Sequence, residues 1–259
     1  MGSYRAKNAS ITELLKAHAR GLLPGMLKVD QGNQEAILRA LNNWGWDDDL
    51  KLYLPFDETS GATAHDLSGN GNTGTATGTT IVDGVFGKAR SFNGTSDFVD
   101  CGPGGFVLTN MTLEVWANPA VNLIDQPNYV AFIDKGHSWS LATWRDGEVI
   151  MQTYYGDGTS WVRATSTTIP VANTWYHFAG VANGTDLIMY VNGVEEGRTS
   201  LPGTVYNKPT EQVLIGNDED SPLRFFNGLI DEPRIYSRGL SADEMYLHWL
   251  AGALKLGLI

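Results

Sequence analysis

The stretch FNGLIDEPRIYSRGLSADE, residues 226–244, decides the fold, because a β-strand pattern in it runs directly into the start of a helix. Asn227-Gly228 is a turn signal, and the run that follows it carries the apolar and aromatic residues typical of a strand. Ser241, with Glu244 three residues later, predicts a capping box that opens a helix. The adjacent carboxylates of Asp231 and Glu232 leave three interpretations open: catalytic, metal-binding or structural.

The composition indicates a β-rich globular body with an appendage. The chain has 259 residues, of which 30 are glycine, and 42% are hydrophobic. This length suits one large β domain, or a domain of roughly 200 residues with an extension, and the composition favours the second. From Leu52 to Tyr236, short apolar runs alternate with clusters of Gly, Asn, Asp and Thr. The pattern predicts a mainly β protein, an antiparallel sandwich or jelly roll.

The expected strands follow from these apolar runs and the turn signals between them. Asn192-Gly193 lies between the runs LIMYV and VEEG and predicts a two-residue hairpin turn. The predicted strands cover residues 50–56, 96–101, 111–117, 128–134, 138–144, 148–154, 160–166, 175–182, 186–191, 212–216 and 229–236.

Both ends of the chain carry helical patterns. Capping and apolar periodicity predict helices over residues 10–21 and 33–44, a helical hairpin within an N-terminal extension of residues 1–49. Residues 247–259 form an apolar C-terminal tail, for which we expect a short helix beside the sandwich or against the hairpin. This segment is too short to cross a bilayer and is interrupted by Lys255, so no membrane span is predicted.

The net charge of −11 lies in the body of the chain. Residues 1–50 hold equal numbers of acidic and basic side chains, so the whole excess of acid lies after residue 50. Such a body repels phosphate backbones, so nucleic acid is excluded as a partner, whereas glycans and cations remain compatible. Cys101 is the single cysteine, so no disulfide within the chain is expected. The N-terminus shows no secretion signal.

Six motifs in order carry a resemblance to a known family. They are LYLPFDETSG, DLSGNGNTGT, GVFGKARSFNGTSDFVDCG, MTLEVWANP, NTWYHFAGVANGTDLIMYVNGVEEG and FNGLIDEPRIYSRGLSADE. Together, over residues 50–246, they resemble the laminin-G-like jelly rolls of the concanavalin A-like lectin/glucanase superfamily. The resemblance implies two antiparallel sheets with a concave and a convex face, and a role in binding glycans, proteins or surfaces. It also implies that Trp116 and Trp175 are core residues.

Catalysis has little support in the residues. Members of the wider superfamily that hydrolyse glycosidic bonds use two carboxylates about 5–9 Å apart, on a strand with alternating acidic residues. Glu114 stands alone in its strand, and side chains as close in sequence as Asp231 and Glu232 would point to opposite faces. No Gly-x-Ser-x-Gly motif is present, so we expect a protein that is not an enzyme.

Calcium is the one cofactor that the resemblance implies. Related jelly rolls often hold one structural calcium ion near the first and last strands, and Asp57 and Asp231 are the candidate ligands, followed by Asp66 and Asn70. Residues 66–71 also share the first positions of an oxygen-rich calcium loop, but Thr77 replaces the glutamate that would complete it. A turn held by Asx and glycine geometry is the alternative interpretation.

The segment 137–163 concentrates aromatic residues among small polar ones, a composition that suits sugar binding. Because strand residues alternate between faces, Trp139 and Trp144 cannot line one site. Our candidate ligand-binding residues are Trp144, Arg145, Tyr155 and Trp161.

Two classes of function remain open. The first is a non-enzymatic recognition module that binds glycans or a cell surface through the sandwich. The second is a structural subunit on the surface of a virion or particle, such as a decoration or fibre protein, docked through its helical ends. Both predict an extracellular or particle-surface location, and both allow a homo-oligomer or docking onto a larger assembly.

Overall fold

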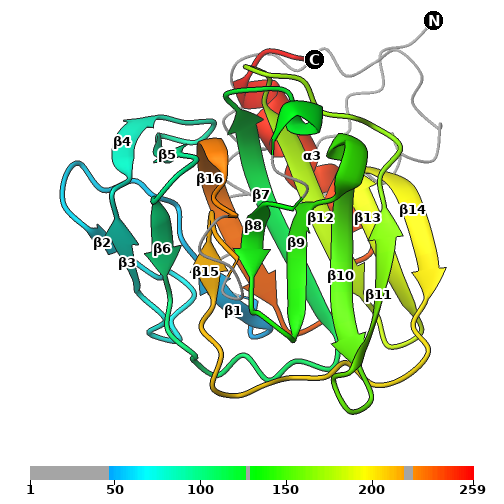
Figure 1. Cartoon of the computed structure of the whole chain (residues 1–259). Helices are drawn as coiled ribbons and strands as arrows, with labels where there is room; N and C mark the ends of the chain where they lie inside the picture. The colour runs from blue at the N-terminus through cyan, green and yellow to red at the C-terminus, as the bar shows by residue number, and fades with distance from the viewer. Residues whose placement is uncertain (1–46, 127–128, 219–223) are drawn as a thin grey trace, which may run out of the picture.

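The computed structural model describes residues 47–126, 129–218 and 224–259. In these residues two antiparallel sheets pack face to face and one α-helix follows the last strand, which confirms the predicted fold class (Figure 1). The predicted helical hairpin over residues 10–44 lies outside the described residues.

Each sheet has eight described strands. In spatial order, the first sheet contains β14 (Val194–Ser200), β13 (Asp186–Val191), β12 (Tyr176–Ala182), β7 (Met111–Pro119), β16 (Asn227–Tyr236), β5 (Lys88–Asn93) and β4 (Thr80–Asp83), and β1 (Leu50–Tyr53) also pairs with β16. The second sheet contains β11 (Ser160–Thr165), β10 (Val149–Tyr155), β9 (Trp139–Thr143), β8 (Ala131–Asp134), β15 (Leu214–Ile215), β6 (Phe98–Asp100), β3 (Gly74–Thr77) and β2 (Thr63–Ala64). The helical segments are η2 (Leu123–Asp125), η3 (Arg145–Gly147) and α3 (Ala242–Lys255).

Every predicted strand overlaps an observed one, and the predicted hairpin turn is confirmed. Asn192 and Gly193 have φ values of 50° and 74° between β13 and β14, as a tight turn of this kind requires. The sequence did not predict β2 to β5 or β14, which are short or rich in Gly, Thr and charged residues.

The turn predicted at Asn227-Gly228 is wrong. Both residues belong to β16, where they pair with Asn93 and Phe92 of β5. Glycine is needed at 228 for close approach, because a Cβ there would lie 2.4 Å from the carbonyl oxygen of Asn118.

The main core lies between the sheets. On β7, alternate residues including Leu113 and Val115 point inward, and the stacked rings of Phe132 and Phe178 join the two sheets with centroids 5.1 Å apart. The intervening residues of β7, Glu114 and Trp116, belong to the opposite face.

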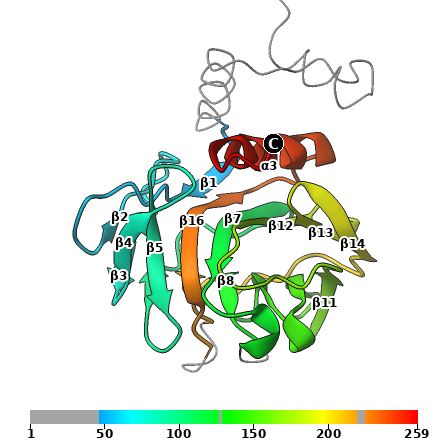
Figure 2. The same cartoon turned by 90° about the horizontal axis from the view of Figure 1, so that it is seen from above.

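Helix α3 covers the outer face of the first sheet (Figure 2). Trp116 is buried there, and a Cβ on Gly252 of α3 would lie 2.1 Å from its ring. The expectation that Trp116 is buried is confirmed, but Trp175 is only half-buried. Helix α3 contains residues 247–255 of the apolar tail, which confirms the short C-terminal helix expected beside the sandwich.

The ionised carboxylate of Glu114, on β7, anchors α3 to the first sheet. His248 of α3 lies 2.7 Å from its carboxylate, His177 of β12 lies 3.3 Å away, and Arg234 of β16 lies 3.1 Å away. Burial alone would raise the pKa of Glu114, but His248, His177 and Arg234 outweigh it and hold the pKa well below its usual range.

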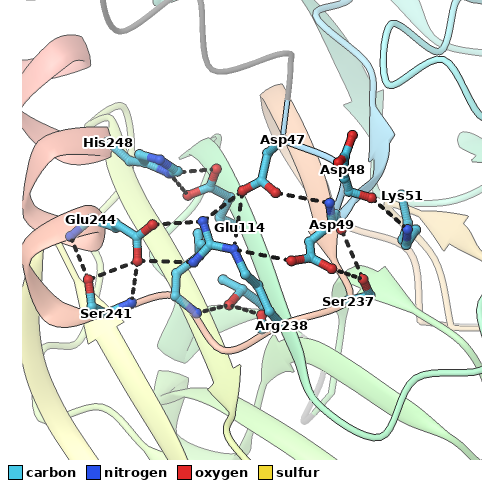
Figure 3. A network of polar contacts seen from close by, with 12 residues as sticks. Asp47, Asp48, Asp49, Lys51, Glu114, Ser237, Arg238, Ser241, Glu244 and His248 are labelled. Carbon is cyan, nitrogen blue, oxygen red and sulfur yellow. Dashed lines mark hydrogen bonds and ion pairs between the residues drawn. The ribbon is translucent and has the colours of Figure 1, made fainter.

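The start of α3 is fixed by a second polar network (Figure 3). The predicted capping box is present: Glu244 donates its backbone N–H to Ser241 Oγ, and its carboxylate accepts from the Ser241 backbone. Arg238 bridges this carboxylate and Asp47, each at a distance between 2.6 and 2.7 Å. Among the described residues no helix has the length and apolar character to cross a membrane.

The substitution Glu244→Gln should lower the melting temperature near neutral pH by roughly 2–4 °C, which corresponds to about 1 kcal/mol for a partly exposed cap. Burial opposes ionisation of Glu244, but hydrogen bonds from Arg238 and Ser241 outweigh it and lower its pKa from 4.5 to about 2. The folded pKa lies below the unfolded one, so the stabilisation is complete above pH 4.5 and is lost as the pH falls through 2. Thermal melts against pH measure this.

The matched control is Asp243→Asn, which removes the same charge from an exposed position in the same turn of α3. A melting curve of the Glu244 variant that coincides with that of the control would contradict the role of the cap and the Arg238 bridge.

Candidate functional site

A pocket of about 190 Å³ lies on the outer face of the second sheet. This sheet forms the side of the sandwich away from α3 (Figure 2). Strands β8, β10 and β11 contribute lining residues, and others come from the segments that flank β8 and β9. It combines aromatic rings with carboxylate, amide and guanidinium groups. Its lining residues are Tyr129, Asp134, Gly136, Trp144, Gln152, Tyr154, Trp161, Asp218 and Arg224.

Strand alternation explains how these side chains come to face outward. On β10, Val149 and Met151 enter the main core, so Gln152 and Tyr154 point to the other face. Trp161 of β11 pairs directly with Tyr154 and shares that face. The pocket is therefore built from the residues of β10 and β11 that the core does not use.

Two tryptophans form one wall of the pocket, and the side chain of Arg163 lies against both of their rings. The rings of Trp144 and Trp161 lie 5.9 Å apart, and Trp161 is 43% exposed. The guanidinium of Arg163 lies 4.3 Å from the centroid of Trp144 and 5.2 Å from that of Trp161. These cation–π contacts fix the orientation of both rings. Arg145 lies 5.4 Å from the Trp144 ring and is exposed.

The base of the pocket rests on a small apolar cluster, which contains Tyr129 and buried side chains of β8, β9 and β10. The Tyr129 hydroxyl donates to Ser140 Oγ at 2.6 Å and lies 3.4 Å from Asp134 Oδ2. Burial and the neighbouring Asp134 carboxylate raise the pKa of Tyr129 well above its usual value, so the hydroxyl keeps its proton. The backbone N–H of Gly136 donates to Asp134 Oδ1 at 2.7 Å.

The charges of the lining are arranged around one ion pair. Arg224 donates to Asp218 at 2.5 Å, and its guanidinium lies 5.1 Å from the ring of Tyr129. Asp134 and Asp218 are only 2% and 3% exposed, so both carboxylates lie in a weakly solvated wall. Among the described residues, the lining thus has two carboxylates and one guanidinium.

Gln152 has an unsatisfied acceptor. The side chain is buried, and its Oε1 has no hydrogen-bond partner among the described residues. Arg163 pairs with Gln152 across the strands, and its buried Nη1 likewise has no hydrogen-bond partner among the described residues. Buried polar atoms of folded proteins are nearly always paired, so unpaired ones beside a pocket point to a ligand or ordered water as the missing partner.

Of the four predicted ligand-binding residues, two line the pocket and two do not. Trp144 and Trp161 line the pocket, and Arg145 covers the Trp144 ring from outside. Tyr155 packs against the main core, and its neighbour Tyr154 lines the pocket instead. The register between β10 and β11, with Tyr154 opposite Trp161, is the signal that separates the two tyrosines.

Five lining residues were not predicted from the sequence: Tyr129, Asp134, Gln152, Asp218 and Arg224. Asp134 belongs to β8 and Gln152 to β10, Tyr129 precedes β8, and Asp218 and Arg224 lie on either side of residues 219–223. No spacing in the sequence relates them, because they meet only when the strands pair.

Two of the predicted calcium ligands face the same loop. Asp231 Oδ2 accepts from the backbone N–H groups of Val85 at 2.8 Å and Phe86 at 3.0 Å, and Asp57 Oδ1 accepts from that of Lys88 at 2.8 Å. Asp231 is fully buried, and its Oδ1 has no hydrogen-bond partner among the described residues. Burial, followed by the charge of Glu232, raises the pKa of Asp231 well above its usual value.

The other two predicted ligands belong to a separate turn. Asp66 accepts from the backbone N–H groups of Ser68 and Asn72 at 2.9 and 2.8 Å, and Asn70 donates to the carbonyl of Leu50 at 2.7 Å. These bonds are those of an Asx-held turn. In the portion of the chain that the structure describes, no group of three or more His, Cys, Asp or Glu side chains is placed to hold a metal.

Glu232 has different partners from Asp231. A bulge in β16 gives Glu232 a φ of 56°, and its carboxylate accepts from the Tyr53 hydroxyl at 3.0 Å and pairs with Arg234. Burial raises the pKa of Glu232 to about 7, and Arg234 limits the increase. The two adjacent carboxylates therefore do not converge on one open site.

Comparisons with known proteins agree with this architecture. The profile of the Laminin_G_3 family, described as the concanavalin A-like lectin/glucanases superfamily, matches residues 93–245. No curated protein sequence matches the chain.

Three solved structures illustrate the likeness in fold. Domain 4 of AbnA, an extracellular arabinanase from Geobacillus stearothermophilus solved with arabinotriose, has a TM-score of 0.62 at 22% identity, over 76% of this chain and 97% of that one. The binding domain of Paraclostridial Mosquitocidal Protein 1 has a TM-score of 0.62 at 19% identity, over 78% and 52%. The binding domain of botulinum neurotoxin DC in complex with SialylT has 0.63 at 12%, over 79% and 52%. This chain thus spans about half of each toxin chain, and at these identities the likeness establishes the fold.

Proposed function

The chain belongs to the concanavalin A-like lectin/glucanase superfamily, and on this basis we propose that it is a non-enzymatic recognition module that binds a glycan in the pocket of the second sheet. The observation that supports this most is the wall of Trp144 and Trp161 beside buried polar groups. Sugar rings have apolar faces and hydroxylated edges, so aromatic rings with a few placed polar groups suit them.

Each part of the pocket has a role in this proposal. Trp144 and Trp161 contact the apolar face of the sugar, and Arg163 holds the two rings in place. Gln152 and Asp134 offer oxygen atoms to sugar hydroxyls. The complexes of similar folds with arabinotriose and SialylT support a glycan as the ligand class.

The absence of catalysis is part of the proposal. Glu114 is enclosed by two histidines and Arg234 beneath α3, and Glu232 is paired with Arg234 and Tyr53. A glycosidase needs two carboxylates on either side of one accessible bond. An extracellular site of action, where glycans are displayed, follows from the proposed ligand.

The recognition proposal predicts that Trp161→Ala and Trp144→Ala each weaken glycan binding by roughly tenfold or more, about 1.4 kcal/mol, because each removes an aromatic wall. Glycan-array binding followed by titration calorimetry on the strongest ligand measures this.

Trp249→Ala is the matched control, since Trp249 is half-buried on α3, on the other side of the sandwich. It should bind like the unaltered protein. Folded Trp144 and Trp161 variants that retain full glycan affinity would exclude the pocket as the binding site.

We also propose one structural calcium ion at Asp57 and Asp231. The support is the buried, unpaired Oδ1 of Asp231 beside Asp57 and the glycine-rich loop. Calcium prefers carboxylate and backbone carbonyl oxygens, and it would supply charge neutralisation there. Because Asp57 follows β1 and Asp231 lies in β16, the ion would join the first strand to the last.

Calcium addition should therefore raise the melting temperature of chelator-treated protein by several degrees at saturating concentration, since a ligand of the folded state stabilises it by about 2.7 kcal/mol at 100 times its dissociation constant. Asp231→Asn should abolish this response, whereas Asp66→Asn, at a separate turn, should retain it. Identical melts of the unaltered protein in calcium and in excess chelator would refute the site.

The particle-subunit alternative and the homo-oligomer remain predictions. Both depend on the helical ends of the chain. The N-terminal end lies outside the described residues, and the C-terminal helix, α3, packs on the sandwich of its own chain.

A further inference from the structure

We propose that the pocket of the second sheet selects a single uncharged sugar unit and rejects acidic sugars, with the Asp218–Arg224 pair as its charge filter. This inference rests on the proposed glycan-binding function and specifies its ligand class. Neither the fold nor the family determines this property, because it depends on the charges of the lining.

The size of the pocket limits the ligand. Its volume of about 190 Å³ is below the 300–1,000 Å³ of sites for drug-sized molecules. One sugar ring fits between the tryptophan wall and the polar groups, while further units of a longer glycan must extend into solvent.

The carboxylates of the lining oppose a negatively charged ligand. Asp134 and Asp218 are almost fully buried, at 2% and 3% exposure, so water screens their charges weakly. A uronic acid or another acidic sugar would bring a third carboxylate into the same space. Like charges placed together in an interface strongly disfavour binding.

The guanidinium in the lining already has an anionic partner. Arg224 donates to Asp218 at 2.5 Å. An acidic sugar that approached Arg224 would compete with Asp218 for the same guanidinium and would bring its carboxylate beside the buried carboxylate of Asp218. A hydroxyl group brings no such charge, so the pair suits hydroxyl groups.

The other arginines near the pocket contact ring faces. Arg163 lies over Trp144 and Trp161, and its Nη1 is buried. Arg145 is exposed and lies over Trp144. Neither is among the described lining residues, and both guanidinium groups lie over ring faces, so their charge supports the aromatic wall.

Hydroxyl groups of a neutral sugar fit the acceptor oxygen atoms of the lining. A carboxylate oxygen accepts more than one hydrogen bond, so Asp134 can receive a sugar hydroxyl while it accepts from Gly136 and Tyr129. The Oε1 of Gln152 has no partner among the described residues and can accept another. The pocket is thus rich in acceptors, and neutral sugars are rich in donors.

The test uses matched pairs of immobilised sugars that differ only in one charge: glucose and glucuronic acid, galactose and galacturonic acid, mannose and mannuronic acid. The whole chain should bind at least one neutral member, and its acidic counterpart roughly tenfold more weakly or not at all. Equal or stronger binding of the acidic members would overturn the selectivity while leaving glycan binding intact. Binding of neither member of any pair, nor of any glycan on an array, would overturn the proposed function itself.

The variant Asp218→Asn tests the filter directly. It removes one carboxylate and the anionic partner of Arg224, so the ratio of neutral to acidic sugar affinity should fall by roughly tenfold. Asp146→Asn is the matched control, because Asp146 is exposed beside Trp144 and has a φ of 60°, which asparagine tolerates. It should leave the ratio unchanged.

A ratio unaltered in folded Asp218→Asn would refute the role of the pair. Should this variant fail to fold, Arg224→Gln provides the second test: acidic sugars should then be rejected still more strongly, and improved binding of acidic sugars would refute the filter.

Discussion

The buried carboxylate of Glu114 is the constraint on which the arrangement of this molecule depends. A charge in the middle of β7 requires compensation, and loss of one partner of a buried ion pair typically costs about 3–5 kcal/mol. Its partners come from β12, β16 and α3, so one side chain joins two neighbouring strands and the C-terminal helix. The helix is thereby fixed over the first sheet, where it also buries Trp116.

This placement determines where the molecule can bind a ligand. The outer face of the first sheet is covered by α3 (Figure 2), whereas the outer face of the second sheet holds the pocket. There the alternation of β10 divides its residues between two tasks, since Val149 and Met151 fill the core while Gln152 and Tyr154 face outward. Core packing on one side of the sheet thus orients the polar and aromatic groups on the other.

Much of the fold was predictable because it depends on local patterns. The Asn192-Gly193 turn and the capping box at Ser241 each involve a few consecutive residues, and both are present. Strand β5 was missed because its buried Arg90 bonds to the carbonyl of Thr63 and to Thr79, and such remote partners leave no periodic signal. The turn predicted at Asn227-Gly228 was wrong for a similar reason: the close approach of Gly228 to the backbone of Asn118 is set by strand pairing, which local sequence does not encode.

The sequence by itself determined the sandwich, most of its strands and the aromatic segment from which Trp144 and Trp161 line the pocket, because alternation and turn chemistry act over short distances. Only the tertiary structure decided which tyrosine faces outward and which carboxylates surround the pocket. It also decided that Asp57 and Asp231 bond to the same loop before β5, whereas Asp66 stabilises a separate turn. These groups are far apart in the chain. Their positions depend on strand register and sheet packing, which are set by the burial of the whole core.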